Sequence, residues 1–282
     1  MNWFIYSLLG AFFMSAFQVS QKILLKPKSD SQAFTLINSL TGGFLLLLIM
    51  VFETIRYTGN YRILIWVFLV ALVNGVIDLL FSRARQLEEV SKVAIAIQSG
   101  QIWFLLGSFL VFGESLNLVK VFGVFLILSA NLLVVWQNQK LRLTKGILLS
   151  LLATLLFTLA TFSTKVLVQF FSPIFYQATV FLLESILIYL FLGRKVIGRV
   201  RSELRFQGRK ALVVGPFLAL AVFFLTKSLE VGGEASRVFP IFSLALILTT
   251  LSGILFLGER ASVYKKVLAM ILAFIGIYLV RA

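Results

Sequence analysis

One carboxyl side chain, Glu184, stands about midway through the apolar stretch "PIFYQATVFLLESILIYLFLG". Burying a charge in an apolar interior is costly, and a carboxyl group without a counter-charge there tends to take up a proton. Such a group can exchange a proton for a cationic substrate or serve as the substrate's counter-charge. The alternative, weighted about equally, is a permanently protonated side chain that hydrogen-bonds to a neighbouring helix.

A second polar pair, Asn74 and Asp78, lies one helical turn apart in another apolar stretch, so the two side chains face the same way. Asp78 is only four residues from the end of that stretch. An ion pair with a cation at this end, Arg83, Arg85 or Lys92, is slightly favoured over contact with a substrate.

Amide side chains form a third group. Gln98 and Gln101 lie close together in an apolar run with Trp103 beside them, and Ser243 occupies a later run. These polar and aromatic groups are candidate substrate contacts. The alternative is that the amides hold neighbouring helices together.

Two residue types that carry much enzyme and metal chemistry are missing. The chain contains no Cys and no His, which removes thiolate ligands and the commonest metal ligand. The remaining carboxylates and hydroxyls show no spacing diagnostic of a nucleophile with its base. We therefore expect no metal, no cofactor and no enzymatic activity, with an intramembrane enzyme as the least favoured alternative.

The elements that must position these side chains are apolar helices. Of 282 residues, 60% are hydrophobic and only 13% are charged, and the mean hydropathy is +1.02. About 20 apolar residues cross the roughly 30 Å hydrocarbon core of a bilayer as a helix. Ten stretches of this kind are predicted, at about 3–21, 33–52, 63–82, 93–112, 118–136, 146–164, 173–192, 211–226, 238–257 and 262–280. The predicted fold class is an all-α polytopic membrane protein.

The chain repeats itself with an offset of 145 residues. The segment "VFGESLNLVKVFGVFLILSANLLVV" is similar to the later segment "LFLGERASVYKKVLAMILAFIGIYLV". Polar residues at the helix ends match at this offset: Glu89 with Glu234, Ser91 with Ser236, Lys92 with Arg237, Glu114 with Glu259 and Lys120 with Lys265. A slightly different offset pairs Ser20 and Lys22 with Ser163 and Lys165. We predict two five-helix repeats, residues 1–139 and 146–282, joined by a linker at 140–145.

Because five is odd, the second repeat must enter the membrane from the opposite face, which is an inverted-topology repeat. Loop charges agree, since 19 of the 26 Lys and Arg residues fall in loops assigned to one face. The positive-inside rule makes that face cytoplasmic and puts both termini outside. The +15 net charge then reflects orientation, and no nucleic-acid partner is expected. The basic segment 193–210 is predicted to be a cytoplasmic loop that meets anionic headgroups.

The repeated Gly-Glu turns are predicted to be structural. Gly113 and Gly258 supply a left-handed residue that ends a helix. Glu114 and Glu259 favour the positive N-terminal end of the helix that follows. Asn117 and Ser262 are the expected N-caps of those helices.

Lys92 and Arg237 occupy equivalent positions at opposite faces, where they could form alternating gates with acids such as Glu89 and Glu234. Interfacial anchoring is slightly favoured over this role. Pro240 removes a helical hydrogen bond and marks a candidate hinge or binding site.

These residues resemble the drug/metabolite transporter superfamily, specifically its EamA-like branch. The passages that carry the resemblance are "FLVFGESLNLVKVFGVFLILSANLLV" and "VFPIFSLALILTTLSGILFLGERASVYKKVLAMILAFIGIYLV". The second fits better, with Pro240 and Gly276, whereas the first has Ile95 and Asn131 at the matching positions. The resemblance implies a central cavity lined by the first four helices of each half, in an integral protein of the bacterial cytoplasmic membrane.

The leading functional hypothesis is a secondary active transporter, an exporter or exchanger of small metabolites such as amino acids, amines or drugs. It would work by alternating access around a midplane cavity, with protons as the candidate coupling ion. A lipid or lipid-carrier flippase of the same fold is the alternative, and a channel lacks a filter-like loop or ring of charge. A single chain can enclose the site, so a monomer suffices and a homodimer is an alternative.

Overall fold

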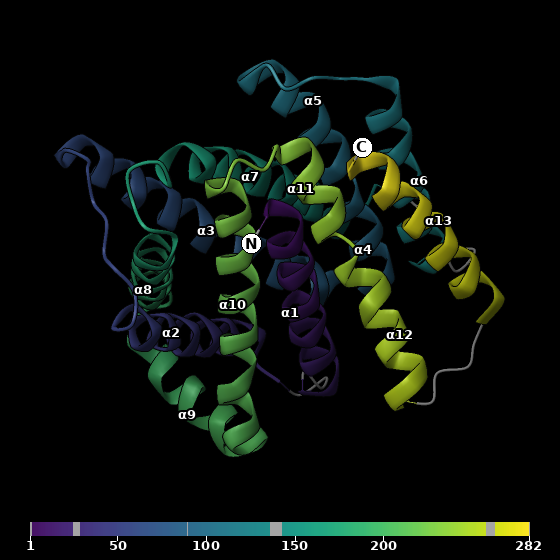
Figure 1. Cartoon of the computed structure of the whole chain (residues 1–282). Helices are drawn as coiled ribbons and strands as arrows, with labels where there is room; N and C mark the ends of the chain where they lie inside the picture. Colours follow the sequence, from purple (N-terminus) through teal and green to yellow (C-terminus); the bar gives the residue numbers. More distant parts are fainter. Residues whose placement is uncertain (1, 25–28, 89, 136–142, 258–262, 282) are drawn as a thin grey trace.

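The computed structural model describes residues 2–24, 29–88, 90–135, 143–257 and 263–281. The first half contains α1 (Trp3–Leu24), α2 (Ser31–Met50), α3 (Tyr61–Leu87), α4 (Val90–Gln98), α5 (Gly100–Phe112) and α6 (Leu118–Val135). The second half contains α7 (Lys145–Leu167), α8 (Pro173–Leu192), α9 (Lys195–Gln207), the 3-10 turn η1 (Gly208–Lys210), α10 (Ala211–Glu230), α11 (Ala235–Phe242), α12 (Ala245–Leu257) and α13 (Val263–Arg281). Figure 1 shows the helices as one bundle.

The predicted membrane-spanning architecture is confirmed. Within the described ranges, nine helical stretches are long and apolar enough to cross a membrane, and α13 adds a shorter apolar stretch, Val267–Arg281. Residues 140–142 of the predicted linker fall outside the described residues, as do Gly258, Glu259 and Ser262.

The two halves are interleaved. Helix α1 packs on α10, α11 and α12 of the second half, and its counterpart α7 packs on α3, α4 and α5 of the first half. Helix α2 packs on α8, and α6 packs on α13. Each contact has its repeat-related counterpart, so most of the interior lies between the halves.

The halves also run in opposite directions. A Cβ on Gly233, at the end of α10, would meet Trp3 at the start of α1. A Cβ on Gly146, at the start of α7, would instead meet Glu88 just after α3. The equivalent helices α1 and α7 therefore begin at opposite ends of the bundle, as an inverted repeat requires.

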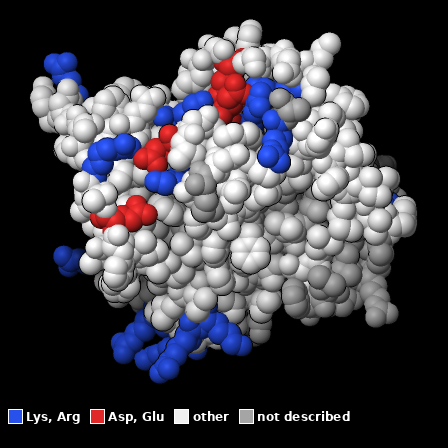
Figure 2. All heavy atoms as spheres, viewed as in Figure 1, with Lys and Arg blue, Asp and Glu red and all other residues white. Residues whose placement is uncertain are grey.

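We name the two ends of the bundle by what they carry. The terminal end holds both chain ends, where the Arg281 guanidinium lies 5.0 Å from the Phe4 ring centroid. The basic end, opposite, holds the cations of α9 and η1. Figure 2 shows these cations gathered at one end, acids and bases side by side at the other, and mostly uncharged sides between them.

Two of the spans are broken, at matching positions. The fourth span is interrupted at Ser99, between α4 and α5, and the ninth at Ser243 and Leu244, between α11 and α12. Adding the repeat offset of 145 to Gln98 and Ser99 leads to the two residues of the second break. Pro240 lies one turn before that break, where a hinge was predicted.

The segment expected to be a basic loop is a helix, which corrects the sequence-based prediction. Helix α8 ends at Gly193, which has a φ of +69°, and α9 then lies across the basic end. Its apolar residues Val196, Val200 and Leu204 recur every four positions and pack against the bundle. An amphipathic pattern within a strongly basic stretch therefore forms a helix on the surface of the bundle.

Candidate functional site

The buried glutamate of the seventh span contacts a serine of the other half. The Ser39 hydroxyl donates a hydrogen bond of 2.8 Å to Glu184 Oε1. Ser39 lies about midway along α2 and Glu184 about midway along α8, so this contact lies near the midplane of the bundle.

Two acids meet at this point. Glu184 is 5% exposed, and its carboxyl group shares a hydrogen bond with the carboxyl group of Asp78 from α3. The sequence favoured an ion pair between Asp78 and a cation at the end of its span, and it did not indicate the contact with Glu184. The contact joins α3 of the first half to α8 of the second half.

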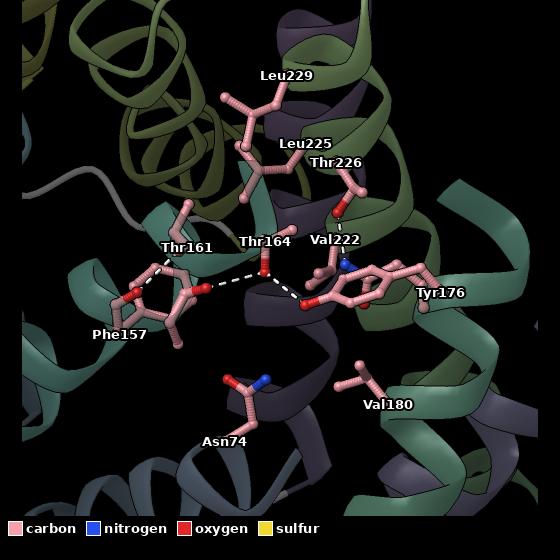
Figure 3. Close-up of a pocket in the computed structure, with 12 residues that line it drawn as sticks. Asn74, Phe157, Thr161, Thr164, Tyr176, Val180, Val222, Leu225, Thr226 and Leu229 are labelled. Carbon is pink, nitrogen blue, oxygen red and sulfur yellow. Dashed lines mark hydrogen bonds between the residues drawn. The ribbon is translucent and has the colours of Figure 1, made fainter. Parts of the chain in front are cut away.

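A small cavity lies one helical turn from these acids, toward the terminal end. Asn74 and Val180, which line it, precede Asp78 and Glu184 by four residues in their helices. Figure 3 shows Asn74 and Val180 on one side of this cavity and Leu225 and Leu229 on the opposite side. The cavity therefore lies between α3, α7, α8 and α10, in contact with both halves.

The walls of the cavity are polar and aromatic. The Tyr176 hydroxyl and Thr164 Oγ1 lie 2.8 Å apart, and the Gln177 amide donates to Thr226 Oγ1 at 2.5 Å. The volume is about 30 Å³, enough for one or two water molecules. A metabolite needs a larger space than this cavity offers.

A second polar cluster lies at the two helix breaks. Gln101 donates to Gln98 Oε1 at 2.7 Å and to Ser243 Oγ at 3.1 Å. Asn131 of α6 donates to the same two atoms at 3.0 Å and 2.9 Å. Gln98 and Ser243 are repeat counterparts, and the axis that relates inverted repeats lies in the plane of the membrane, so this ring of four hydrogen bonds also lies near the midplane.

The predicted amide contacts are thus partly brought together. Gln98, Gln101 and Ser243 share the ring, whereas Trp103 is 42% exposed on the outside of the bundle. Sequence reasoning missed Asn131 as a member of the ring, although its place in an apolar helix was a signal. It also missed Ser39, whose hydroxyl donates to Glu184.

The terminal end is closed by ion pairs between the halves, which we call the terminal ion-pair network. Glu114 accepts a 2.5 Å hydrogen bond from Lys165 Nζ and bonds from the backbone amides of Ala235 and Ser236. Burial alone raises the pKa of Glu114, but the hydrogen bonds from Lys165 and Ser236 outweigh it and hold the pKa below its ordinary value. Glu114 was predicted to stabilise the helix after its own turn; it instead caps α11 of the other half.

Lys120 is the second centre of this network. Its side chain is 1% exposed, and its Nζ donates to Glu234 at 2.7 Å and to Ser236 Oγ at 3.1 Å. Arg237 also pairs with Glu234 at 2.8 Å. A further pair, Arg56 with Glu230 at 2.8 Å, joins the loop after α2 to the end of α10.

The two candidate gating residues lie at opposite ends of the bundle, and gating itself stays a prediction. Arg237 pairs with Glu234 at the terminal end. At the basic end Lys92 lies 3.7 Å from Glu88, and its proposed partner Glu89 is outside the described residues.

Two of the turn residues, Gly113 and Asn117, have the local roles predicted for them. Gly113 has a φ of +64° and ends α5, and the Asn117 side chain accepts the Lys120 amide hydrogen bond at the start of α6.

The basic end carries its own contact between the halves. Asp30 caps α2 and accepts two hydrogen bonds from Arg199 of α9, at 2.5 Å and 2.8 Å. Burial raises the pKa of Asp30, but Arg199 and the backbone amides of Gln32 and Ala33 together lower it below the ordinary value. Among the residues that the structure describes, no group of three or more carboxylates is placed to hold a metal ion.

Comparisons with known proteins agree with this architecture. The model of the EamA-like transporter family matches the chain twice, over residues 1–136 and 144–282. One solved crystal structure aligns with a TM-score of 0.76 at 14% identity, covering 98% of this chain and 95% of that chain. At this identity the likeness concerns the fold. The comparison with curated proteins gave no significant match.

Proposed function

The chain belongs to the EamA-like transporter family, and from this membership we propose that it is a secondary active transporter. Its substrates are small organic metabolites such as amino acids, amines or drugs, which it exports or exchanges. The protein spans the membrane many times, and the terminal end is proposed to be extracellular because the cations of α9 and η1 favour the cytoplasm.

The observation that carries the proposal is the placement of the central cavity. It lies between the inverted halves, next to buried acids near the midplane, and the terminal ion-pair network closes one route to it. Inverted repeats of this kind rock against each other around a fixed site. Transport then requires the pairs Glu114–Lys165 and Lys120–Glu234 to separate as the terminal end opens.

Flux of solutes out of loaded liposomes tests this function. The purified chain is reconstituted, and vesicles loaded with a pooled mixture of amino acids, amines and metabolites are followed by mass spectrometry under an imposed pH gradient. Selective, saturable loss of a few solutes is expected. Equal leakage of all solutes, or none above protein-free vesicles, contradicts the proposal of a metabolite transporter.

A lipid or lipid-carrier flippase is the second candidate, and one feature favours it. An apolar groove of about 210 Å³ lies between α1, α12 and α13, lined by residues that include Leu8, Leu248 and Ile277. An acyl chain fits such a surface. Translocation of fluorescent phospholipids in the same vesicles, together with no flux of soluble compounds, would favour the flippase over the metabolite transporter.

A further inference from the structure

We propose that the ring of amide and hydroxyl groups at the two helix breaks is a sodium-ion site, and that Na⁺ is the coupling ion of transport. The ring consists of Gln98, Gln101, Asn131 and Ser243. Binding of the ion stands on the ring itself. Its role in coupling rests on the proposed transport function, for which the sequence suggested protons.

Two amides of the ring use all their donors and neither of their acceptors. Gln101 Nε2 and Asn131 Nδ2 each carry two hydrogens, and both nitrogens donate to Gln98 Oε1 and to Ser243 Oγ. The oxygens of the same amides, Gln101 Oε1 and Asn131 Oδ1, are buried and have no hydrogen-bond partner among the residues that the structure describes. A buried oxygen without a partner is costly. The ring therefore lacks a hydrogen-bond donor or a cation.

The four corners of the ring can become four oxygen ligands. Gln98 Oε1 and Ser243 Oγ already face the ring, and the Ser243 hydroxyl directs its own hydrogen to the Pro240 carbonyl at 2.6 Å. In the described part of the chain, no donor fixes the outward oxygens of Gln101 and Asn131. Half a turn of each amide group thus exchanges its nitrogen for its oxygen at the ring. A cation at the centre then takes the place of the four hydrogen bonds.

The size of the ring suits a sodium ion. Its four sides measure 2.7–3.1 Å. Sodium is similar in size to calcium, whose oxygen ligands lie at about 2.3–2.6 Å, and a square of ligands at that distance has sides of about 3.3–3.7 Å. The ring therefore has to widen by roughly half an ångström. The larger potassium ion requires a wider ring.

The chemistry of the ring favours a monovalent metal ion. Its amide and hydroxyl side chains do not titrate near neutral pH, so they offer no site for a proton. Divalent cations are held in proteins with the help of carboxylates, and the ring contains none. Neutral oxygen ligands suit a hard cation that carries a single charge.

The backbone at the breaks supplies further oxygens. The Ser99 amide bonds to Ala96, three residues back, and the Leu244 amide bonds to Ile241 in the same way. Each bond replaces the usual helical bond to the fourth residue back, which at the second break is Pro240. Carbonyls at interrupted helices coordinate coupling ions in secondary transporters. The Pro240 carbonyl already contacts the hydroxyl of the ring serine and is a candidate fifth ligand.

The site joins the two halves of the molecule. Gln98, Gln101 and Asn131 belong to α4, α5 and α6 of the first half, and Ser243 follows α11 of the second half. An ion held by all four residues binds most tightly at one relative position of the halves. Its binding therefore shifts the equilibrium between the conformations of the transporter.

Thermal unfolding in detergent tests the site without transport. The purified protein is heated in NaCl, KCl or N-methylglucamine chloride at equal ionic strength. Na⁺ should raise the unfolding temperature by several degrees in a saturable manner, whereas K⁺ should give the same value as N-methylglucamine. Equal stabilisation by all three salts, or none by Na⁺, overturns the site.

Substitutions in the ring locate the ion. Gln101→Leu and Asn131→Leu each remove a ligand oxygen and should abolish the shift that Na⁺ produces. Ser243→Ala is a smaller change that keeps the proposal testable if the leucine variants do not fold, and it should weaken Na⁺ binding by about tenfold or more. A shift that is unchanged in Ser243→Ala and in the leucine variants places the ion elsewhere and overturns the proposal.

Asn38→Leu is the matched control for these variants. Asn38 Oδ1 is also buried without a hydrogen-bond partner among the described residues, but it lies on α2, outside the ring. This variant should keep the shift produced by Na⁺. Loss of the shift in Asn38→Leu as well would show that any buried amide has the same effect, which overturns the assignment to the ring.

A sodium gradient tests the coupling. Proteoliposomes that contain the pooled solutes are given a gradient of Na⁺ or of K⁺ at equal pH on both sides and zero membrane potential. The Na⁺ gradient should drive the transported solutes against their own gradient, and radioactive Na⁺ should cross with them. The K⁺ gradient should not drive them.

The outcomes separate this inference from the proposed function. Selective flux that is indifferent to Na⁺, in a protein that Na⁺ does not stabilise, overturns the sodium site and leaves the transporter proposal standing. Stabilisation by Na⁺ together with flux that is independent of Na⁺ overturns the coupling role. Stabilisation that the ring variants lose, without selective flux of any solute, supports the site and overturns the transport function.

Discussion

At the residue scale, Glu114 shows how one side chain can join two halves of a molecule. Its carboxylate binds Lys165 and lies at the N-terminus of α11, where the helix dipole favours a negative charge. A buried ion pair is costly to break from one side, because the remaining charge is left without its partner.

Replacing Glu114 should therefore weaken the closed terminal end. We expect Glu114→Gln to lower the free energy of unfolding by about 3 kcal/mol at neutral pH, since Lys165 loses its partner. Thermal unfolding in detergent measures this change, and Glu53→Gln is the matched control because Glu53 is exposed. An equal effect of the two substitutions would contradict the role of the pair.

The same carboxylate should make stability depend on pH. Because the pKa of Glu114 is lowered in the folded protein, its contribution is present above the ordinary carboxyl value and is lost as the pH falls through the lowered one. The pKa of Asp30 is also lowered in the folded protein, so its contribution to stability depends on pH in the same direction. The difference in unfolding temperature between wild type and Glu114→Gln should accordingly be constant near neutrality and shrink below about pH 4. A difference that grows with acidity would contradict this assignment.

At the element scale, the approach of α2 to α10 brings two backbones together. A Cβ on Gly215 would lie 2.3 Å from the backbone oxygen of Asn38, and one on Gly42 would lie 2.9 Å from the Gly215 oxygen. Small residues allow such close packing of membrane helices. The same helix α2 carries Ser39, so this packing helps to position the midplane contact with Glu184.

Adding a single methyl group should disturb this contact. We expect Gly215→Ala to destabilise the protein by about 2 kcal/mol, because backbone atoms cannot move aside as a flexible side chain can. Gly198→Ala in α9 is the matched control, since nothing lies within 4 Å of its Cβ position, and it should be neutral or slightly stabilising. Unfolding temperatures of the two variants test the difference, and equal values would contradict the packing argument.

At the scale of the whole molecule, the halves meet at the terminal end through backbone as well as ion pairs. Tyr57 and Phe171 form an isolated antiparallel bridge, flanked by hydrogen bonds from Thr58 to Phe170 and from Ser172 to Arg56. A bridge of this pattern places the two Cα atoms about 4.5 Å apart. That separation lies within the range of a disulfide.

A disulfide here should hold the terminal end closed. The chain contains no native Cys, so Tyr57→Cys with Phe171→Cys introduces a single pair. We expect oxidation to abolish flux in proteoliposomes and a reductant to restore it, while each single substitution retains flux under both conditions. Full transport by the cross-linked protein would contradict opening at this end.

Composition and pattern determined the coarse organisation of this protein. Apolar runs of membrane-spanning length predict helices because each backbone amide in lipid must be paired within its own helix, which is a local requirement. The repeat at 145 residues and the parity of five predict inversion without any structure. The local roles of Gly113 and Asn117 at helix ends were likewise readable from neighbouring residues.

Only the tertiary structure decided which side chains meet. Glu114 caps a helix of the other half, Asp78 meets Glu184, and Asn131 completes the amide ring. Each partner depends on how interleaved helices are rotated and how deeply they are set, and close packing over the whole bundle determines both. That packing depends on residues far apart in the chain, so no local sequence pattern could specify these contacts.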